Sequence, residues 1–399
     1  MTLANGRSYL AIPGPSVVPD RVLTAMHKGA PNIYEGPLID ETHETLDFLK
    51  QMAGTKAHTA IYISNGHGAW EAANSNLFSR GDKALVIATG LFGHGWSTAA
   101  SRLGVEIEML DFGKSCRADA GRIEAALRAD RGHRIKAVLV THVDTASSVR
   151  NDLVEVRAAI DAAGHPALLA VDAIASFGCD RIEMDNMSID VLVAASQKGV
   201  MVPAGLGFIW ASDKARARCR ASDLRTPYWD WDGRFDATVF WQLFAGTPPT
   251  HHLFALHEAL TMILREEGLE HVWARHAKLA AAVWAAVEAW GNGGDIALNV
   301  VSPTERAHSV TALRIGAGGA GALRRWLEEK AGVTLGIPLG MAEPGEPAYG
   351  DFLRIGHMGH VNAHMIMGVL ATMEAGMQAL GIPHGRGALE DAAAVIAGA

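Results

Sequence analysis

Strand-like and helical segments alternate along this chain from about residue 60 to residue 210. Short apolar runs at residues 83–87, 137–141 and 167–171 are separated by helical patterns such as residues 154–164, which end on a glycine. This alternation is typical of an α/β fold, in which helices cross over between the strands of a mostly parallel sheet. Such sheets bind ligands beyond the carboxyl ends of their strands, so the residues that follow each run are the first candidates for a site.

An acid and an amine follow two neighbouring runs. Residues 167–171 lead to Asp172, and the run that starts at Val191 leads through Gln197 to Lys198. Pyridoxal phosphate chemistry needs this pair, because a lysine amine forms a Schiff base with the cofactor's aldehyde and a carboxylate keeps the pyridine nitrogen protonated. We therefore predict that Lys198 and Asp172 are catalytic. The alternative for Lys198 is a solvated residue just past a strand, the usual fate of a lysine.

A glycine turn between a strand and a helix is a candidate phosphate site. Asn65, Gly66 and His67 follow the apolar run at residues 60–63 and precede a helical pattern that begins at Ala69. The N-terminus of a helix offers unpaired N–H groups and the positive end of a dipole, which together bind a phosphate without a lysine. The alternative is an ordinary turn with the asparagine or a serine as N-cap, because no Walker or dinucleotide fingerprint is present.

Two further strand ends carry an aromatic ring and a hydroxyl. Phe92 lies in a glycine-rich stretch, residues 88–96, which we interpret as a turn, and its ring is able to stack on a planar cofactor. Thr145 follows the run at residues 137–141 and is a candidate donor to the phenolic oxygen of that cofactor. Taken singly, core packing explains Phe92 and turn capping explains Thr145. The convergence of several strand ends favours the cofactor site.

The composition is that of a compact protein without a nucleic-acid surface. Of 399 residues, 49% are hydrophobic and 20% are charged, which is enough apolar material for a large core. The formal net charge of -8, with no basic stripe, argues against nucleic acid as a partner. No apolar run nears the length of a membrane span and the first residues lack a secretory pattern, so we expect no membrane and a cytoplasmic location.

The cysteines and histidines predict neither disulfides nor a metal site. Cys116, Cys179 and Cys219 lie far apart and form no C-x-x-C unit, so free thiols in a reducing compartment are expected. The closely spaced histidines at 251–252 and 357–360 accompany no His-Glu-x-x-His motif and no Cys/His cluster. We therefore predict that no metal is bound.

The composition of the sequence changes after the region of alternating strands and helices. Residues 221–250 are rich in aromatics and turns, and we expect these aromatics at a subunit contact or a site wall. A helical pattern from residue 251 to about 290 is expected to break at Gly268, and strand-like runs follow at 310–315 and 352–355. The predicted division is an N-terminal arm (1–20), a large domain (21–268) and a small C-terminal domain (269–399).

The chain resembles a known family, the class V branch of the fold-type I pyridoxal phosphate enzymes, and within it the serine-glyoxylate and alanine-glyoxylate aminotransferases. The resemblance runs from about residue 12 to the C-terminus. It implies a large domain on a mostly parallel, seven-stranded sheet and a smaller C-terminal α+β domain. The motifs that carry it, in order, are Pro13-Gly14-Pro15-Ser16, Asn65-Gly66-His67, Phe92, Thr145, Val171-Asp172-Ala173, Ser196-Gln197-Lys198-Gly199, Tyr228-Trp229-Asp230-Trp231, Gly246-Thr247-Pro248-Pro249 and Leu353-Arg354-Ile355-Gly356-His357.

The resemblance implies that one group of residues contacts pyridoxal 5'-phosphate. Lys198 would form the Schiff base, and Asp172 would hold the pyridine nitrogen. Thr247 would reach the phosphate from the second subunit, so an obligate homodimer with its sites at the interface is expected. The remaining members would meet the phosphate (Asn65, Gly66, His67, Gln197), the phenolic oxygen (Thr145) or the face of the ring (Phe92).

Arg354 is the candidate that would bind the substrate carboxylate. A guanidinium fork matches a carboxylate with two parallel hydrogen bonds, and the neighbours of Arg354 are apolar. The alternative is a surface arginine that pairs with Asp351 or Glu346. With Arg354 in the substrate role, the resemblance implies a ping-pong transamination in which a small amino acid passes its amino group to glyoxylate.

Tyr34 marks a departure from the serine-glyoxylate pattern, in which a His-Arg pair stands near the position of Ile33-Tyr34. A phenol cannot attract a second carboxylate, so we predict that Tyr34 lies in the donor side-chain pocket and that the donor is neutral, serine or alanine. A tyrosine at this position instead resembles pyridoxamine-pyruvate transaminase, which uses free pyridoxamine. An enzyme of that type is the alternative. That relative has a Glu in place of His67 and an Arg in the loop at 337–340.

Two other interpretations are weaker. A cysteine desulfurase needs a nucleophilic cysteine on a C-terminal loop, and no cysteine follows Cys219. An inactive binding module or a regulator on the same fold is a further alternative, because fold does not fix function. Regulators of this type carry an added helix-turn-helix domain, for which the residues before Pro13 leave no room. Lys198, Asp172 and Arg354 together favour an active enzyme.

Overall fold

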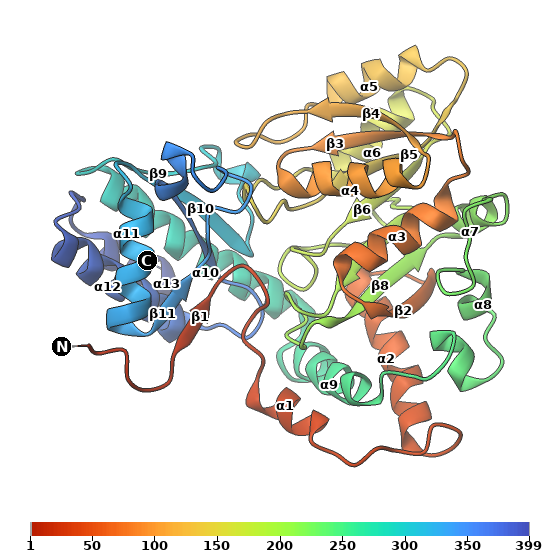
Figure 1. Cartoon of the computed structure of the whole chain (residues 1–399), viewed down its shortest axis with the longest axis horizontal. Helices are drawn as coiled ribbons and strands as arrows, with labels where there is room; N and C mark the ends of the chain where they lie inside the picture. The colour runs from red at the N-terminus through yellow and green to blue at the C-terminus, as the bar shows by residue number, and fades with distance from the viewer. Residues whose placement is uncertain (1, 399) are drawn as a thin grey trace.

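A seven-stranded sheet forms the centre of the larger part of the molecule in this computed structural model, which describes residues 2–398 (Figure 1). Its strand order is β2-β8-β7-β6-β5-β3-β4, and within the described residues six strands are parallel while β8 runs antiparallel to both neighbours. The predicted sheet is therefore confirmed. The strands are β2 (His58–Ser64), β3 (Lys83–Ala88), β4 (Glu106–Asp111), β5 (Ile135–Thr141), β6 (Leu168–Asp172), β7 (Val191–Ala195) and β8 (Gly205–Ala211).

Helices cover both faces of this sheet, because successive side chains of a strand point to opposite sides and both sides are apolar. Leu85 and Ile87 of β3 pack with α2, α5, α6 and α9 on one face. Ala84 and Val86 pack with α3, α4 and α7 on the other. The helices are α2 (Pro37–Ala53), α3 (Gly66–Leu77), α4 (Leu91–Arg102), α5 (Ala120–Ala129), α6 (Leu153–Ala162), α7 (Asp213–Cys219) and α9 (Thr250–Thr261).

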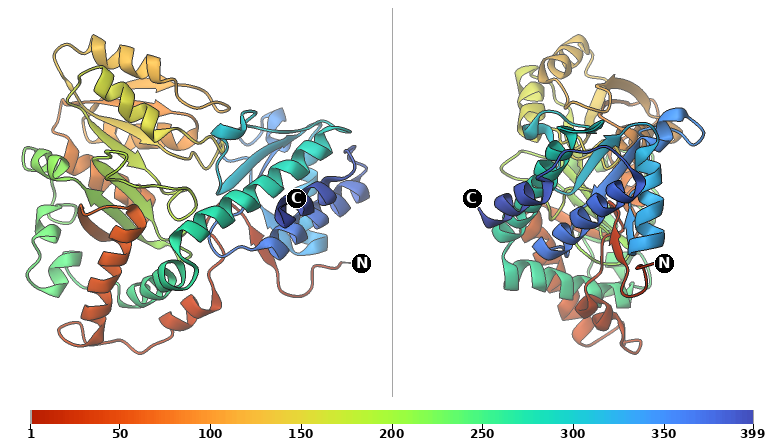
Figure 2. Two further views of the ribbon diagram at one scale, coloured as in Figure 1. Left: turned by 180° about the vertical axis from the view of Figure 1, so that it is seen from behind. Right: turned by 90° about the vertical axis from the view of Figure 1, so that its left-hand side faces the viewer.

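The C-terminal part has a sheet and an apolar core of its own. Its strands pair antiparallel in the order β12-β10-β9, and helix α10 (Leu269–Gly291) runs from the large sheet towards this second core (Figure 2). The N-terminal strand β1 (Tyr9–Ala11) pairs with β11 (Val333–Leu335), so the arm joins this part. The other elements are β9 (Ile296–Leu298), β10 (Val310–Ile315), β12 (Phe352–Gly356), α11 (Gly319–Trp326), α12 (Ala363–Leu380) and α13 (Ala388–Ala397).

Helix α10 contributes to both cores. Val272 near its start packs with the large-domain core, whereas Leu279 and later residues pack with the C-terminal core. The break at Gly268 is observed just before α10, where this glycine has a φ of +84° that other residues rarely adopt. The division of the chain at residues 20 and 268 stays a prediction.

Two details differ from the expected elements. Helix α4 begins at Leu91, inside the stretch 88–96 that we interpreted as a turn, so Phe92 lies in its first turn. Of the aromatics in residues 221–250, Trp231 is fully buried in the core on the α3 face, whereas Trp241 is half exposed. Among the described residues, none of the helices combines the length and apolar character that crossing a membrane requires.

Candidate active site

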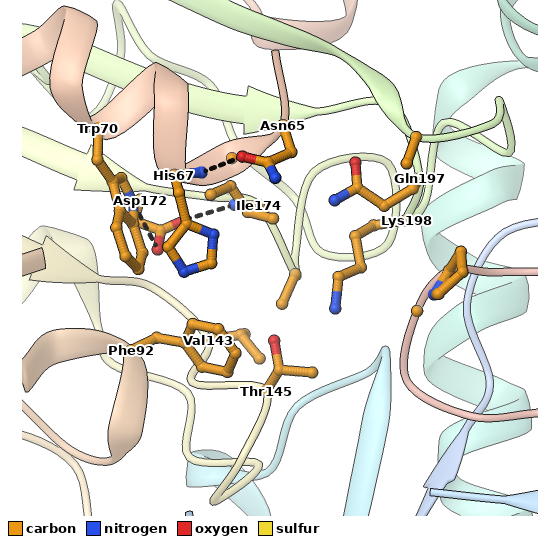
Figure 3. Close-up of a pocket in the computed structure, with 15 residues that line it drawn as sticks. Asn65, His67, Trp70, Phe92, Val143, Thr145, Asp172, Ile174, Gln197 and Lys198 are labelled. Atoms are coloured by element: carbon orange, nitrogen blue, oxygen red, sulfur yellow. Dashed lines mark hydrogen bonds between the residues drawn. The ribbon is translucent and has the colours of Figure 1, made fainter. Parts of the chain in front are cut away.

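A cavity of about 240 Å³ lies beyond the carboxyl ends of β6 and β7 (Figure 3). Asp172 ends β6, and Lys198 follows β7 by three residues, so the sheet topology brings the acid and the amine to one place. Parallel strands with connections of this kind open a crevice at this edge. The residues that line the cavity are Gly14, Pro15, Asn65, Gly66, His67, Trp70, Phe92, Val143, Thr145, Asp172, Ile174, Ala175, Gln197, Lys198 and Ala204.

The Asp172 carboxylate is buried, with 2% of the residue exposed, and is held by two N–H donors. The backbone N–H of Ile174 donates to its Oδ1 at 2.7 Å, and the indole N–H of Trp70 donates to its Oδ2 at 3.2 Å (Figure 3). Burial raises the pKa of Asp172 to about 7, and the two donors oppose that rise. The carboxylate is therefore fixed in place and sensitive to any cation placed beside it.

The Lys198 amine is also buried, with 8% of the residue exposed, and donates a hydrogen bond to the carbonyl of Pro13. Burial, together with the charge of Arg354, lowers the pKa of Lys198 to about 8. The N-terminal arm packs directly on this residue: the hydroxyl of Ser16 donates to the Lys198 carbonyl at 2.7 Å. A β-carbon on Gly14 would come within 2.7 Å of the Lys198 side chain. The amine is thus confined and readily deprotonated.

The start of helix α3 differs from the simple picture of free N–H groups. The Asn65 side chain accepts hydrogen bonds from the backbone N–H groups of His67 and Gly68, at 3.1 and 3.3 Å. The N-cap interpretation is therefore observed, and Asn65 competes with any phosphate for these two donors. Gly66 is needed for space, because a β-carbon there would lie 2.3 Å from the side chain of Ile174.

Gln197 offers a polar atom that the chain itself does not satisfy. Its Oε1 is buried and has no hydrogen-bond partner within residues 2–398. Buried polar atoms are nearly always paired, so such an atom at the wall of a cavity indicates a missing ligand or water. It lies next to Lys198 and across the cavity from the His67 side chain (Figure 3).

Phe92 and Thr145 lie on the side of the cavity formed by β3 and β5, and Asp144 ties them together. The buried Asp144 carboxylate accepts hydrogen bonds from the backbone N–H groups of Phe92, at 2.7 Å, and Ala146, at 2.9 Å. Burial raises the pKa of Asp144, and these donors oppose the rise. The turn after β5 and the first turn of α4 are therefore locked to each other, which fixes the positions of both lining residues.

Arg354 on β12 is 5% exposed and makes no ion pair within the described residues. Its guanidinium donates to the carbonyls of Ile337, at 2.8 Å, and Thr145, at 2.9 Å. Burial lowers its pKa to about 10. The predicted alternative of a surface pair is wrong: Asp351 accepts from the backbone of Gly318, and Glu346 from that of Glu343. Arg354 does not line the cavity directly but contacts Thr145, which does.

Tyr34 and Thr247 lie apart from the cavity. Tyr34 precedes α2 and is 78% exposed, and Thr247 is exposed in the segment between residue 244 and α9. Neither lines the cavity within residues 2–398. One copy of the chain therefore does not bring these two predicted site residues to Lys198.

Two residues of the site carried no role in the sequence-based prediction. Trp70 lies one helical turn after His67, and this spacing of three places both side chains on one face of α3. Asp144 directly precedes Thr145 at a strand end. The position of Asp144 in a turn gives no sign that its carboxylate accepts from the backbone N–H groups of Phe92, Ala146 and Ser147, so its role was recognisable only from the structure.

The histidine pairs considered for a metal make other contacts. His251 and His252 each hydrogen-bond to a backbone carbonyl, and His357 is buried against the hydroxyl of Thr311 at 2.9 Å. A different group, Cys219 with Asp230 and Asp232, is close enough for ligation. Its two aspartates are already paired with Arg216, Arg220 and Arg225. No metal is assigned to it.

Comparison with known protein families gives a match over most of the chain. Residues 8–340 match the family described as Aminotransferase class-V. The chain belongs to the class V aminotransferases. The family and the curated relatives, which are named as aminotransferases, together support a pyridoxal phosphate-dependent transaminase, and the expected family and fold are confirmed.

Individual relatives align with nearly the whole length of this class V aminotransferase. A serine-glyoxylate aminotransferase from Methylorubrum extorquens is 37% identical over 92% of this chain and 90% of its own length. An L-aspartate-glyoxylate aminotransferase from Paracoccus denitrificans is 36% identical over 93% of this chain and 91% of its own. Among solved structures, a pyridoxamine-pyruvate aminotransferase from Mesorhizobium loti superposes over 100% of both chains with a TM-score of 0.88 and 26% identity.

Proposed function

We propose that this class V aminotransferase moves an amino group from a small neutral amino acid, serine or alanine, to glyoxylate, in a ping-pong reaction with pyridoxal 5'-phosphate. The observation that carries the proposal is one cavity lined by the buried amine of Lys198 and the buried acid of Asp172. Arg354, a buried arginine without an anionic partner in the described residues, contacts Thr145 at the wall of this cavity. Relatives named for glyoxylate support the acceptor, and the relative named for serine supports the donor, whereas another relative is named for aspartate.

The residues around the cavity suit the cofactor. Lys198 would bind its aldehyde, and Asp172 would face its protonated ring nitrogen, whose charge would bring the pKa of the carboxyl back below 7. Gln197 and the turn at Asn65–His67 would meet the phosphate. The amide NH2 of Gln197 would donate to a phosphate oxygen, and a water between the phosphate and the unpaired Oε1 would donate to both. Phe92 supplies an aromatic face and Thr145 a hydroxyl on the remaining side.

The chemistry divides between the cofactor and this chain. When bound, the cofactor supplies an electron sink for the carbanion that forms when a substrate loses its α-proton. Lys198, released as a free amine, would take the proton from the substrate α-carbon and would deliver it to the carbon of the cofactor's former aldehyde. A pKa near 8 suits an amine that accepts and donates a proton near neutral pH.

Arg354 accounts for the requirement for a carboxylate. A buried guanidinium without a counter-charge is unfavourable, because its desolvation is not repaid by an ion pair. Two of its N–H groups hold backbone carbonyls, which leaves the others to form a charge-assisted fork with an α-carboxylate. Amino acid and 2-oxo acid carry the same carboxylate, so one arginine serves both halves of the reaction.

The identity of the donor rests on the absence of a second cation at the cavity wall. Apart from Lys198, the described lining residues include no lysine or arginine, so nothing there pairs with the side-chain carboxylate of aspartate. Serine and alanine are therefore the proposed donors. The alternative is an enzyme of the pyridoxamine-pyruvate type, and the structural neighbour of that name supports it as a related activity. His67, at the position of that relative's Glu, argues against it.

We further propose that the enzyme is a homodimer with its sites at the interface. The exposed Thr247 and Tyr34 support this proposal, because both have roles by resemblance that a single chain leaves unfilled. A partner subunit would supply Thr247 to the phosphate and Tyr34 to the donor side chain.

A half-reaction screen tests the function. The purified enzyme, loaded with pyridoxal phosphate, is mixed with one amino acid at a time, and loss of the cofactor's visible absorbance is recorded. Serine or alanine should react fastest, and glyoxylate should restore the starting spectrum. Aspartate as the best donor would overturn the neutral-donor assignment, and reaction of the unloaded chain with free pyridoxamine and pyruvate would favour the alternative enzyme. No reaction with any amino acid would indicate an inactive binding module.

Covalent trapping tests the lysine separately. Borohydride reduction of the loaded enzyme followed by peptide mapping should place the label on Lys198, and Lys198→Ala should take up none. The rate of capture should rise with pH through about 8, because only the deprotonated amine attacks the aldehyde. An unperturbed lysine would show this rise near 10.4. Label on another lysine would reject the assignment.

A further inference from the structure

Trp70 makes a contact at the site to which neither the fold family nor the proposed reaction assigns a role. It is 1% exposed, and its indole N–H points at the Asp172 carboxylate (Figure 3). The carboxylate has two hydrogen-bond donors in the described residues, and the other is the backbone N–H of Ile174. Within residues 2–398, Trp70 is therefore the one side chain that donates a hydrogen bond to Asp172.

The indole is held rigidly in this position. Its ring stacks on Trp96, with centroids 6.1 Å apart and planes 9° from parallel. His67 meets it edge-on at 4.7 Å and Phe92 at 6.3 Å. Trp96 is itself anchored, because its indole N–H donates to the side chain of Asn74 at 3.0 Å. The direction of the Trp70 N–H bond is thus set by the packing between α3 and α4.

The electrostatic setting makes a neutral donor valuable. Burial disfavours the ionised form of Asp172, and the nearby Asp144 carboxylate disfavours it further. Lys198 is the cation that opposes these effects, and it loses its charge when it is deprotonated for reaction. A hydrogen bond from an indole favours the carboxylate at every pH, because indole does not titrate.

We propose that Trp70 is a positioning residue that keeps the Asp172 carboxylate ionised and oriented for a protonated ring nitrogen, including when Lys198 is neutral. The inference rests on the proposed use of pyridoxal phosphate. The ring of Trp70 also borders the cavity, but its effect on the ring nitrogen would pass through Asp172. Its aromatic ring packs between α3 and α4, and its N–H group donates the hydrogen bond to Asp172.

The test is a titration of Asp172 in the full chain without cofactor. Infrared spectra are recorded against pH for each tryptophan background with and without Asp172→Asn, and the difference gives the protonated carboxyl of Asp172. Trp70→Phe keeps an aromatic ring but removes the N–H, so the midpoint should rise by about one pH unit, since hydrogen bonds to charged groups are of that strength. Trp96→Phe removes an indole N–H from the same stack without touching Asp172, and its midpoint should stay at the wild-type value.

A second variant separates the N–H group from the shape of the ring. Site-specific replacement of Trp70 by benzothienylalanine exchanges the N–H for sulfur in a ring of nearly the same size, and it decides the question if Trp70→Phe melts at a much lower temperature. The same upward shift is expected. A midpoint equal to that of the wild type in the benzothienylalanine protein, or an equal shift in Trp96→Phe, would overturn the inference.

Kinetic measurements distinguish a role of Trp70 in orienting Asp172 from a role in packing alone. In the loaded enzyme, Trp70→Phe should lower the rate of the alanine half-reaction by about tenfold, the counterpart of one pH unit, while KM changes less than twofold because Arg354 is untouched. Equal losses in rate and in carboxylate binding would indicate a packing role alone. If borohydride finds no adduct on Lys198, the proposed function fails, but the titration without cofactor still reports whether Trp70 acts on Asp172.

Discussion

The residues expected at the cofactor and at the donor side chain fall into two regions of the molecule that behave differently. Those at strand ends, such as Asp172, Thr145 and Lys198, line one cavity in a single chain. Those in connecting segments, Tyr34 and Thr247, are exposed and lie outside it. Strand ends of a parallel sheet are brought together by the ladder itself, whereas an exposed segment is placed by whatever packs against it. One chain thus brings the strand-end residues together, and we propose that a second copy supplies Tyr34 and Thr247.

The strongest test of the first region is Asp172→Asn. The substitution keeps the shape of the side chain but removes the charge that would hold the ring nitrogen protonated. We expect turnover to fall by at least about two orders of magnitude, comparable to the loss of a well-placed electrostatic stabiliser. Steady-state kinetics measures the loss, and borohydride trapping on Lys198 serves as the control that the cofactor still binds. Turnover near that of the wild type would remove Asp172 from the reaction centre.

Arg354→Ala tests whether the C-terminal part of the chain contributes to that centre. Donor and acceptor would present the same carboxylate to this guanidinium, so kcat/KM should fall for both half-reactions alike, by about a hundredfold or roughly 2.7 kcal/mol. Single-turnover kinetics with alanine and with glyoxylate gives the two values. Arg306→Ala is the matched control, because Arg306 is a buried arginine whose side chain bonds the carbonyls of Val300 and Val301. A loss confined to one half-reaction would contradict a shared carboxylate site.

Subunit mixing tests the second region. Thr247→Ala should weaken cofactor retention by about tenfold, the value of one hydrogen bond to a charged group, as measured by dialysis. Mixed with Lys198→Ala, it should form hybrid dimers that hold one site with both defects and one with neither. At equal amounts with free exchange, about a quarter of the sites should be intact. Thr250→Ala is the control for retention. No recovery, when exchange is shown by labelled subunits, would place the whole site within one chain.

Tyr34→Arg should give the smallest effect on the shared chemistry. The added charge should shift the ratio of donor efficiencies towards aspartate, while glyoxylate use stays within about tenfold, or roughly 1.4 kcal/mol. Competition between alanine and aspartate measures the ratio. Leu23→Arg adds the same charge at another exposed position and should leave the ratio unchanged. Equal changes in donor and acceptor use would show that Tyr34 does not lie in the donor pocket.

Much of the cavity could be predicted because its members follow apolar runs in the sequence. Asp172 ends β6 and Thr145 follows β5, and the helix start at Asn65 was recognisable from its strand-turn-glycine pattern. Phe92 was assigned to the right place for partly the wrong reason, since α4 begins one residue before it. Its backbone N–H bonds to Asp144, a contact between two strand ends that no local pattern indicates.

The sequence by itself determined the α/β architecture, the pair Lys198 and Asp172, and the family, because periodic apolar runs and residues at fixed offsets from them are local properties. Only the tertiary structure decided that Trp70 reaches Asp172, that Arg354 is buried without a carboxylate, and that Asn65 caps the helix beside the cavity. These are contacts across long separations in the chain or choices between competing hydrogen-bond partners. Packing of the whole molecule selects among them, because each buried polar group takes the partner that the surrounding fold brings within reach.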